Sequence, residues 1–515
     1  MNLRQSLRCT PVELQFGTSG RRGLVVDLTQ LEVYINALAE LEYLQSLPRE
    51  EGGIVRSEEF YFARDLRPSS GKIAEAIVQA MRDAGMAPVN LGLVPTPAIT
   101  YHALEHGRGS MMITGSHIPF DRNGYKANSS KGELLKEQEG PINARVAEVR
   151  ARLYAEDPER SAFDADGNLK QPVEWPPETH TDWVRRFADF FPGKLLAGKR
   201  VLVYQHSAVG RDLLVVTLRE LGAEVVPAGR SNTFVPIDTE NIGAPELAAI
   251  QALVDANGSF DAVVSTDGDS DRPLVLGVEN GKAPFFGGDL VGMIVAEYLG
   301  ADAVVVPVTC NDGVDRGALA GVLEPKTRIG SPFVIAGMEA ARKKGKKRVC
   351  GWEPNGGFLV GSDIERDGRV LKALATRDAF LPVVTVLVAA AEQGCAVSDL
   401  FARLPRRFSK AALVRNFARA VSLKILESLD EAAVARYFSP ELGFGAVSRI
   451  DGTDGIRVMF SNGDVAHVRP SGNADELRIY AVADSQARAD EIVAMGVREP
   501  DGILRAMEIG VIGRG

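Results

Sequence analysis

The sequence predicts an α/β protein of three or four domains, and two observations support this fold class. Short β-rich runs are repeatedly followed by helical patterns, as in residues 60–63 with 71–84 and residues 201–205 with 211–221. Strands that alternate with helices are typical of α/β units on mixed or parallel sheets. The chain has 515 residues, which corresponds to three or four domains at about 150 residues per domain.

Two more strand-like runs, at residues 262–265 and 303–308, extend this alternation, and the second is followed by a helical pattern at 312–319. After residue 409 the pattern changes. DGTDGIRVMF, a turn at residues 461–463 and VAHVRP predict a β-hairpin. We therefore expect the chain to end in a small α+β domain.

Three breaks divide the chain. Residues 156–180 are rich in Pro, Asp and Glu, which favours a linker between the first and second domains. Further breaks are expected near residues 279–284 and 405–409. The predicted domains are residues 1–158, 159–280, 281–403 and 404–515.

The composition excludes several classes of protein. Hydrophobic residues make up 45% and charged residues 25% of the chain, which is ordinary for a soluble globular protein and rules out a mainly disordered one. The formal net charge is −9, whereas a general nucleic-acid binder normally carries a basic surface. We therefore expect no nucleic-acid partner, although a local basic cleft could still hold a small anion. The short basic run KKGKKR at residues 343–348 is expected to be the solvated end of a helix rather than a nucleic-acid contact.

Cysteine use and apolar stretches indicate a cytosolic protein. The four cysteines are scattered without a CxxC pair, which disfavours a zinc knuckle or a thioredoxin-type dithiol and fits a reducing compartment. The first residues, MNLRQSLRCTPVELQF, lack the apolar core of a secretory signal. The most apolar stretch, residues 381–391, is shorter than the ~20 residues that span a bilayer. We expect a cytoplasmic location and no membrane partner.

Five loops contain residue types that could carry chemistry. The first, FGTSGRRG at residues 16–23, follows a strand-like run at residues 12–16. Its glycines would let backbone N–H groups approach an anion, and its arginines would add charge-assisted hydrogen bonds. The glycine spacing matches neither GxGxxG nor the Walker A motif, so phosphate binding and an ordinary turn both stay open for this loop.

The second loop follows an apolar run and reads MMITGSHIPFDRNGYK. Ser116 is expected on a turn at the end of a strand, with His117 beside it and Lys126 further along. A serine in this setting suits a nucleophile or a phosphoryl carrier. The alternative is a hydroxyl that only stabilises the turn. The GxSxG elbow of α/β-hydrolases does not fit, because Ile118 stands where that motif has Gly.

The third loop, TDGDSDR at residues 266–272, lies between two strand-like runs and predicts a metal site. In a flat strand Asp267, Asp269 and Asp271 would stand ~6.6 Å apart per step, but Gly268 lets the loop fold so that their carboxylates converge. Converging carboxylates repel one another without a cation, and oxygen-only ligands indicate a hard ion, Mg²⁺ or Ca²⁺. A polar hairpin tip is the alternative.

The fourth and fifth loops carry polar groups suited to a sugar phosphate. GWEPNGG offers Glu353 and Asn355 between two strands, where they could hydrogen-bond sugar hydroxyls or simply form a glycine turn. RPSGNADELR, at residues 469–478, offers a hydroxyl, backbone amides and a side-chain amide between two arginines. If a helix begins at Ala474, its N-terminus would favour a phosphate, and a capped helix start without a ligand is the alternative.

Taken in this order, the five loops resemble those of the α-D-phosphohexomutase family, which covers phosphoglucomutases, phosphomannomutases and phosphoglucosamine mutases. The resemblance runs from FGTSGRRG to RPSGNADELRIY, nearly the whole chain, and TGSH and DGDSDR are its most specific motifs. It implies four domains around a central cleft, each contributing a loop. Three would be related α/β domains with mixed sheets, and the last a smaller α+β domain.

The resemblance also implies roles for individual residues. Ser116 would carry the phosphoryl group, and Asp267, Asp269 and Asp271 would bind Mg²⁺ together with the phosphate on that serine. The residues implied to act on the transferring phosphoryl group are Arg22, Lys126 and Arg272, with His117 beside the nucleophile. The residues implied to bind sugar hydroxyls are Glu353 and Asn355. The residues implied to bind the phosphate that does not react are Arg469, Ser471, Gly472, Asn473 and Arg478.

The chain departs from the family pattern in two loops. The sugar-reading loop usually carries Glu-x-Ser-Gly, where this chain has Asn355, and some members have His where this chain has Gly357. The serine motif reads TGSHIP where many members have Asn before the Pro. Because Ile118 is not a catalytic type of residue, we expect the serine geometry to be retained.

The resemblance implies an intramolecular phosphotransferase that interconverts hexose 6-phosphate and hexose 1-phosphate through a phosphoserine and a bisphosphate. Phosphomannomutase is favoured, because RPSGNADELRIY and the TGSHIP to DRNGYK run look most like bacterial phosphomannomutases; phosphoglucomutase and phosphoglucosamine mutase are alternatives. The expected partners are mannose or glucose phosphates and a hexose 1,6-bisphosphate activator, acting on a monomer or homodimer.

Three questions stay open at this point. His117 and Lys126 are both candidates for the general base. A catalytically silent sugar-phosphate-binding protein is a different interpretation, although both the nucleophile and the metal loop are intact. A phosphatase or a bisphosphate synthase would share the phosphoserine step.

Overall fold

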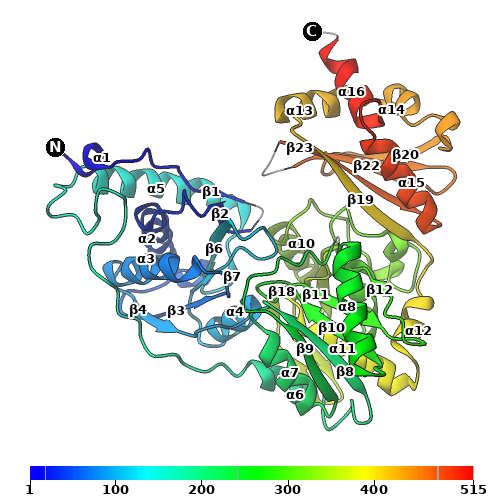
Figure 1. Cartoon of the computed structure of the whole chain (residues 1–515), viewed down its shortest axis with the longest axis horizontal. Coiled ribbons are helices and arrows are strands. Elements are labelled where there is room, and N and C mark those ends of the chain that lie inside the picture. Colours follow the sequence, from blue (N-terminus) through cyan, green and yellow to red (C-terminus); the bar gives the residue numbers. More distant parts are fainter. Residues whose placement is uncertain (18, 241, 472–474, 514–515) are drawn as a thin grey trace.

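The structure is a computed structural model, and it describes residues 1–17, 19–240, 242–471 and 475–513. These residues form four units, each built on its own main sheet. In Figure 1 the first unit lies at the left, the second and third lie below and to the right, and the fourth lies above them at the right. The predicted α/β class with a smaller α+β unit at the C-terminus is confirmed.

The first unit is a mixed sheet with helices on both faces. Its elements are α1 (Leu3–Ser6), β1 (Gln15–Phe16), β2 (Arg21–Leu24), α2 (Gln30–Ser46), β3 (Glu59–Arg64), α3 (Ser70–Asp83), β4 (Ala87–Asn90), α4 (Thr96–Glu105), β5 (Ser110–Ile113), β6 (Arg122–Ser129), β7 (Gly132–Glu133) and α5 (Glu139–Tyr154). The strand order is β1-β2-β6-β5-β3-β4, with β7 beside β6. Side chains of β3 alternate between faces: Phe60 and Phe62 pack with α2 and α3, whereas Tyr61 packs with α4.

The second unit places the aspartate loop at the tip of a hairpin. Its elements are α6 (Trp183–Phe190), β8 (Arg200–His206), α7 (Arg211–Glu220), β9 (Glu224–Arg230), α8 (Ala244–Asn257), β10 (Ala262–Thr266), β11 (Pro273–Gly277) and β12 (Phe285–Phe286). The strand order is β12-β11-β10-β8-β9. β8, β9 and β10 are parallel, and β11 returns antiparallel to β10, so the loop between β10 and β11 projects from the sheet as the sequence predicts.

The third unit presents the GWEPNGG loop between β14 and β15. Its elements are α9 (Gly288–Tyr298), β13 (Ala303–Val305), α10 (Ser331–Lys343), β14 (Val349–Trp352), β15 (Phe358–Val360), β16 (Ile364–Arg366), β17 (Arg369–Leu371), β18 (Leu374–Asp378), α11 (Phe380–Gln393) and α12 (Val397–Ala402). The main sheet has the order β13-β14-β15-β18. The helix expected at residues 312–319 is wrong: only a 3-10 turn forms, Asp312–Asp315, because glycines interrupt this stretch and the Asp312 carboxylate pairs with Arg407.

The fourth unit is an antiparallel sheet with its own helices. Its elements are β19 (Phe408–Arg415), α13 (Arg419–Ser428), α14 (Glu431–Tyr437), β20 (Val447–Asp451), β21 (Ile456–Phe460), β22 (Val465–Pro470), β23 (Glu476–Ala483), α15 (Gln486–Val497) and α16 (Ile503–Ile512). The predicted hairpin is confirmed as β21 and β22. The helix considered from Ala474 onward is wrong for the described residues, because β23 occupies them from Glu476. Leu477, Ile479 and Ala481 are buried at every second position, which is the period of a strand.

One large apolar core runs through the first three units, from Tyr61 to Leu404. The fourth unit has a separate core, which includes Ile479 and Leu504. β12 pairs with β11 although it lies beyond the predicted border at residue 280, and the domain borders themselves stay predictions. Within the described residues, no helix combines the length and the apolar character that a membrane span requires.

The start of α9 packs directly against the GWEPNGG loop, and this contact gives the first prediction. A Cβ atom on Gly288 would lie 2.3 Å from the backbone nitrogen of Gly356. We expect Gly288→Ala to lower the free energy of unfolding by about 1–3 kcal/mol through overpacking, as measured by urea denaturation. The matched control is Gly140→Ala in α5, whose added Cβ would meet nothing within 4 Å and should not destabilise. Equal effects of the two changes would contradict the packing argument.

Candidate active site

Ser116 lies on a tight turn directly after β5, as the sequence predicts. Its φ is 52°, a left-handed conformation that is uncommon for a residue with a side chain. Its backbone N–H donates to Oγ1 of Thr114 at 2.7 Å. Its hydroxyl donates to Oδ2 of Asp267 at 2.7 Å. The turn therefore directs the hydroxyl across the junction between the first and second units.

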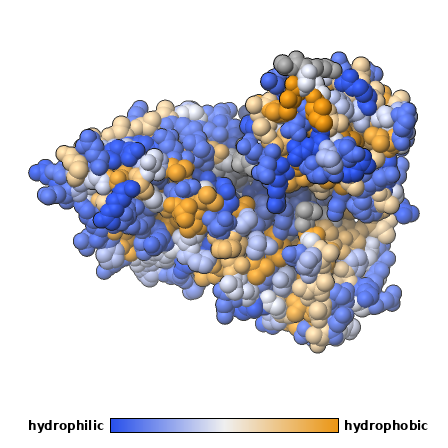
Figure 2. Space-filling view, turned by 45° about the horizontal axis from the view of Figure 1, so that its top comes forward, coloured by the Kyte–Doolittle hydropathy of each residue, from blue (hydrophilic) through white to orange (hydrophobic). Residues whose placement is uncertain are grey.

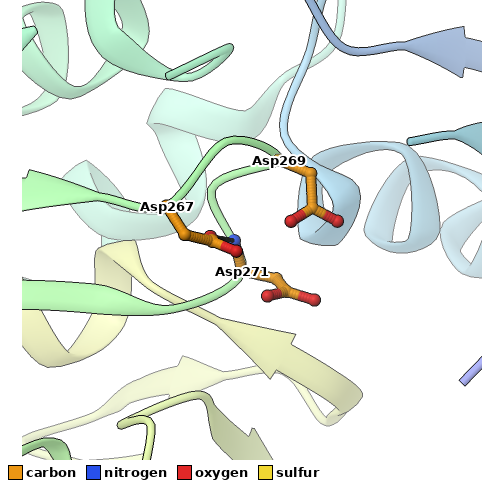
Figure 3. A group of neighbouring side chains, drawn as sticks. All are labelled: Asp267, Asp269 and Asp271. Atoms are coloured by element: carbon orange, nitrogen blue, oxygen red, sulfur yellow. Dashed lines mark hydrogen bonds between the residues drawn. The ribbon is translucent and has the colours of Figure 1, made fainter. Parts of the chain in front are cut away.

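Asp267, Asp269 and Asp271 are buried on the loop between β10 and β11. Each can offer one carboxylate oxygen within 4.8 Å of those of the other two, and Figure 3 shows their side chains directed toward a common space. Ser270 has a φ of 58°, and the backbone N–H of Asp271 donates to Oδ1 of Asp267 at 3.1 Å. The loop folds back on itself, so the carboxylates converge as predicted.

This donor set fits a divalent cation. Within the described part of the chain, Oδ1 of Asp269 and Oδ1 of Asp271 are buried without a hydrogen-bond partner, which costs about 1–3 kcal/mol per group unless another ligand binds them. Burial and the two neighbouring carboxylates raise the pKa of Asp267 well above its usual range. Burial alone would also raise the pKa of Asp269, but the ammonium group of Lys126 holds it well below that range. The three aspartates are therefore a donor set that could hold a divalent cation through oxygen ligands only.

Two of the predicted cations in the first unit interact with these carboxylates, Lys126 by direct hydrogen bonds and Arg22 electrostatically. Nζ of Lys126 on β6 donates to Oδ2 of Asp269 at 2.8 Å and to Oδ2 of Asp271 at 2.6 Å. Arg22 lies on the neighbouring strand β2, opposite Gly124 of β6. Burial lowers the pKa of Arg22 to about 10, and the charge of Asp269 opposes that shift. Both cations belong to the same charged cluster as the aspartates.

His117 and Arg272 flank the serine on the other side. Nδ1 of His117 lies 3.4 Å from the Ser116 hydroxyl, and its Nε2 lies 3.5 Å from Nη1 of Arg272. Burial and the nearby Arg272 guanidinium lower the pKa of His117 well below its usual value. The imidazole is therefore neutral near pH 7, and the same surroundings disfavour its protonated form.

The structure brings the GWEPNGG loop to the same cluster. Glu353 and Asn355 are buried, and Oε2 of Glu353 accepts a hydrogen bond from Nη1 of Arg377 at 2.8 Å. Oδ1 of Asn355 accepts from the backbone N–H of Gly357 at 3.0 Å, so this oxygen shapes the loop itself. The Asn355 backbone carbonyl accepts from Oγ1 of Thr239 at 2.9 Å, which ties the loop to the second unit.

The predicted phosphate clamp lies on two neighbouring strands of the fourth unit. Arg469 on β22 stands opposite Arg478 on β23. Arg469 also pairs with Asp454 at 2.9 Å and Arg478 with Glu476 at 2.9 Å, so an anion bound beside the pair would share each guanidinium with a carboxylate. Ser471 is buried, and its backbone carbonyl accepts from Nη1 of Arg419 at 2.6 Å. Gly472 and Asn473, also predicted for this clamp, lie outside the described residues.

The clamp faces the same region as the other loops. The carboxylate of Glu240, from the second unit, interacts electrostatically with Arg272, Glu353 and Arg478, which come from three different units. Figure 2 shows the surface hollowed where the fourth unit, at the upper right, meets the rest of the molecule. The described residues of the five predicted loops thus lie about one junction.

Comparisons with known proteins identify the family. Three family models match, those described as the phosphoglucomutase/phosphomannomutase alpha/beta/alpha domain I, alpha/beta/alpha domain III and C-terminal domain, over residues 13–152, 287–408 and 414–499. A phosphomannomutase of Sinorhizobium fredii is 38% identical over 488 residues, which cover 94% of this chain and 98% of that protein. The chain belongs to the phosphoglucomutase/phosphomannomutase family.

A second member of this family, a phosphomannomutase of Salmonella muenchen, is 36% identical over 494 residues, 93% of this chain and 94% of that protein. Among solved structures, a phosphoglucomutase/phosphomannomutase family protein of Burkholderia thailandensis superposes with a TM-score of 0.69. Its sequence identity is 19%, and the match covers 96% of this chain and 98% of that one. This likeness shows that the family fold is shared.

Among the residues that sequence reasoning missed, Arg67 and Thr96 hold the Ser116 turn and the Asp269 carboxylate in place. Arg67 is buried, and its Nη2 donates to the backbone carbonyls of Ser116 at 2.8 Å and Ile118 at 2.5 Å. Since only the backbone of Ile118 is used, this side chain does not disturb the serine loop. Oγ1 of Thr96, at the start of α4, donates to Oδ2 of Asp269 at 2.7 Å. A motif search gives no signal for either residue, because their partners are distant in sequence.

The metal site gives the second prediction. We expect Asp269→Asn to weaken divalent-cation binding about tenfold or more, because the neutral amide removes a charged ligand. Isothermal calorimetry with Mg²⁺ and Mn²⁺ measures this in the absence of any sugar phosphate. The control is Asp212→Asn, an exposed carboxylate that pairs with Arg230. A metal affinity that both variants leave unchanged would contradict the site.

Proposed function

We propose that the protein is a phosphomannomutase, which interconverts mannose 6-phosphate and mannose 1-phosphate through a phosphoserine at residue 116 and mannose 1,6-bisphosphate. The observation that supports this most is the 2.7 Å hydrogen bond between the Ser116 hydroxyl and Asp267, which holds a hydroxyl suited to carry a phosphoryl group beside the aspartate cluster. The choice of mannose follows the names of the two relatives at 38% and 36% identity. The proposal includes a cytoplasmic location and a monomer or homodimer.

The reaction would consist of two phosphoryl transfers of the same kind. In the first, a sugar hydroxyl oxygen attacks the phosphorus of phosphoserine 116, the bond from phosphorus to the serine oxygen breaks, and mannose 1,6-bisphosphate forms. In the second, the serine oxygen attacks the other phosphate of the bisphosphate, and the isomeric monophosphate leaves. Such transfers depend mainly on position and charge neutralisation. Mg²⁺ held by Asp267, Asp269 and Asp271 would supply a Lewis acid for the phosphate oxygens.

The surrounding side chains would supply the proton acceptor and the positive charges that the transfers need. We assign the proton acceptor for the attacking hydroxyl to His117 from its position, because its Nδ1 lies 3.4 Å from the serine hydroxyl. Lys126 donates to two carboxylates, so its ammonium group serves as a fixed positive charge. Arg22 and Arg272 would balance the oxygens of the transferring phosphoryl group.

The unreacting phosphate would bind at the fourth unit through Arg469, Ser471 and Arg478, with Gly472 and Asn473 as further predicted contacts. Because the bisphosphate must present each phosphate to Ser116 in turn, this clamp has to accept the sugar in two orientations. The separate core of the fourth unit supports a movement of that unit relative to the other three.

Substrate preference is the third prediction. The purified protein, with Mg²⁺ and a trace of hexose 1,6-bisphosphate, should isomerise mannose 1-phosphate with a higher kcat/KM than glucose 1-phosphate or glucosamine 1-phosphate. A coupled assay for each 6-phosphate measures this. A higher value for glucose would make the protein a phosphoglucomutase instead. Isomerisation of none of them would contradict the proposal, and steady release of inorganic phosphate would indicate a phosphatase.

The fourth prediction concerns the carrier. Ser116→Ala should lower kcat by about 10³-fold or more, because the group that holds the phosphoryl intermediate is lost. Intact-mass analysis after incubation with hexose 1,6-bisphosphate should show a phosphoryl adduct on the unaltered protein and none on this variant. The control is Ser428→Ala, a serine in the fourth unit whose hydroxyl donates to a backbone carbonyl. Normal turnover by Ser116→Ala would show that another residue is the carrier.

A further inference from the structure

Gly357 stands where some family members have His, and the packing of the Arg377 side chain on β18 explains this difference. A Cβ atom on Gly357 would lie 2.5 Å from Cδ, 2.7 Å from Cγ and 2.9 Å from Cβ of Arg377. Non-bonded carbon atoms pack at ≈ 3.5–4.0 Å, so a side chain at residue 357 and the present Arg377 side chain exclude each other. The glycine leaves the volume that the arginine fills.

In that volume the Arg377 guanidinium connects two loops. Its Nε and Nη2 donate to Oδ2 of Asp271 at 3.1 and 3.0 Å, and its Nη1 donates to Oε2 of Glu353 at 2.8 Å. All three side chains are buried, with exposed fractions of 5%, 1% and 4% for Arg377, Asp271 and Glu353. One side chain thus joins the metal loop of the second unit to the sugar-reading loop of the third.

The backbone on both sides of Arg377 is fixed. Oγ1 of Thr376 donates to Oε1 of Glu133 in the first unit at 2.5 Å. Oδ1 of Asp378 accepts from the backbone N–H of Phe380 at 2.8 Å, at the start of α11. The strand that carries Arg377 is therefore held by hydrogen bonds of the two adjacent residues, and the guanidinium is held by its two acceptors.

Arg377 orients the carboxylates of Glu353 and Asp271 in different ways. Among the described residues, Arg377 is the only hydrogen-bond partner of the Glu353 carboxylate. Oδ2 of Asp271 accepts from Arg377 and Lys126, whereas its Oδ1 is left without a hydrogen-bond partner. The arginine thus fixes the direction of Glu353 and leaves one oxygen of Asp271 for the cation site. A lysine could supply the charge but not the planar fork that reaches both acceptors.

We propose that Arg377, for which Gly357 makes room, is a positioning residue that couples the metal loop to the sugar-reading loop. It holds Glu353 toward the sugar hydroxyls and holds Asp271 so that Oδ1 faces the cation. The part that concerns the sugar rests on the proposed function; the part that concerns the cation and the shared volume does not.

The steric part is tested with three variants and thermal unfolding. Gly357→Ala alone should lower Tm, because the new Cβ meets the Arg377 side chain. In the Arg377→Ala background the same change should cause no further loss, because the space is free. Additive losses of Tm would overturn the claim that the two residues share one volume.

The coupling part is tested with Arg377→Lys and two binding measurements that need no turnover. Calorimetry with Mg²⁺ alone should show affinity about tenfold weaker or worse, as for other partners that orient metal ligands. Calorimetry with mannose 6-phosphate on EDTA-treated protein should also show weaker binding. The matched control is Arg366→Lys on β16, a half-exposed arginine that pairs with Glu392. Both affinities unchanged in Arg377→Lys would overturn the proposal.

A second variant tests whether Arg377 acts on the sugar phosphate through Glu353. Glu353→Gln should weaken sugar-phosphate binding and leave Mg²⁺ affinity unchanged, and combining it with Arg377→Lys should add no further loss of sugar-phosphate binding. An additive loss would mean that Arg377 does not act through Glu353. If the unaltered protein isomerises no hexose phosphate, the proposed function fails, while the Mg²⁺ and Tm measurements still decide the role of Arg377.

Discussion

The arrangement of the first three units depends on neutralising carboxylates that are buried together. Asp267, Asp269 and Asp271 are fully buried, and unpaired buried charges would destabilise the protein by several kcal/mol each. The second unit supplies these acids, while Lys126 comes from the first unit and Arg377 from the third. The charges that would take part in catalysis are therefore also the charges that fix the first three units relative to one another.

The fourth unit is attached differently. It has its own apolar core, and a buried arginine in its connection to the third unit, Arg407, pairs with Asp312 and Asp484. Its proposed contribution to the site is the pair Arg469 and Arg478 on adjacent strands. A centre held by buried charges and a separately folded clamp would suit the proposed reaction, whose intermediate has to turn around between two transfers.

Sequence reasoning succeeded where the chemistry is contiguous. TGSH and DGDSDR each hold several polar groups within one turn, so the local backbone decides their geometry and the motif predicts how these groups converge. It failed where the partner is remote: Arg67 bonds to Ser116, Arg377 to Asp271 and Thr96 to Asp269 across 49, 106 and 173 residues. The helix considered from Ala474 was wrong for another reason, because the two-residue period of LRIYAVA outweighs a possible capping signal.

The sugar-reading loop shows why a departure from a motif need not mean a lost function. In the sequence of the loop alone, Glu353 lacks the Ser that family members usually carry and the His that some carry, because Asn355 and Gly357 stand at those positions. In the folded chain the Asn355 side chain accepts a hydrogen bond from the loop backbone. The side chain of Arg377 on β18 packs against Gly357, and its guanidinium donates to the Glu353 carboxylate. Since burial makes an unpaired carboxylate costly, Glu353 can be retained at this position only if a cation reaches it from somewhere in the fold. A glycine in a catalytic loop can therefore mark the place where a side chain from a distant strand enters.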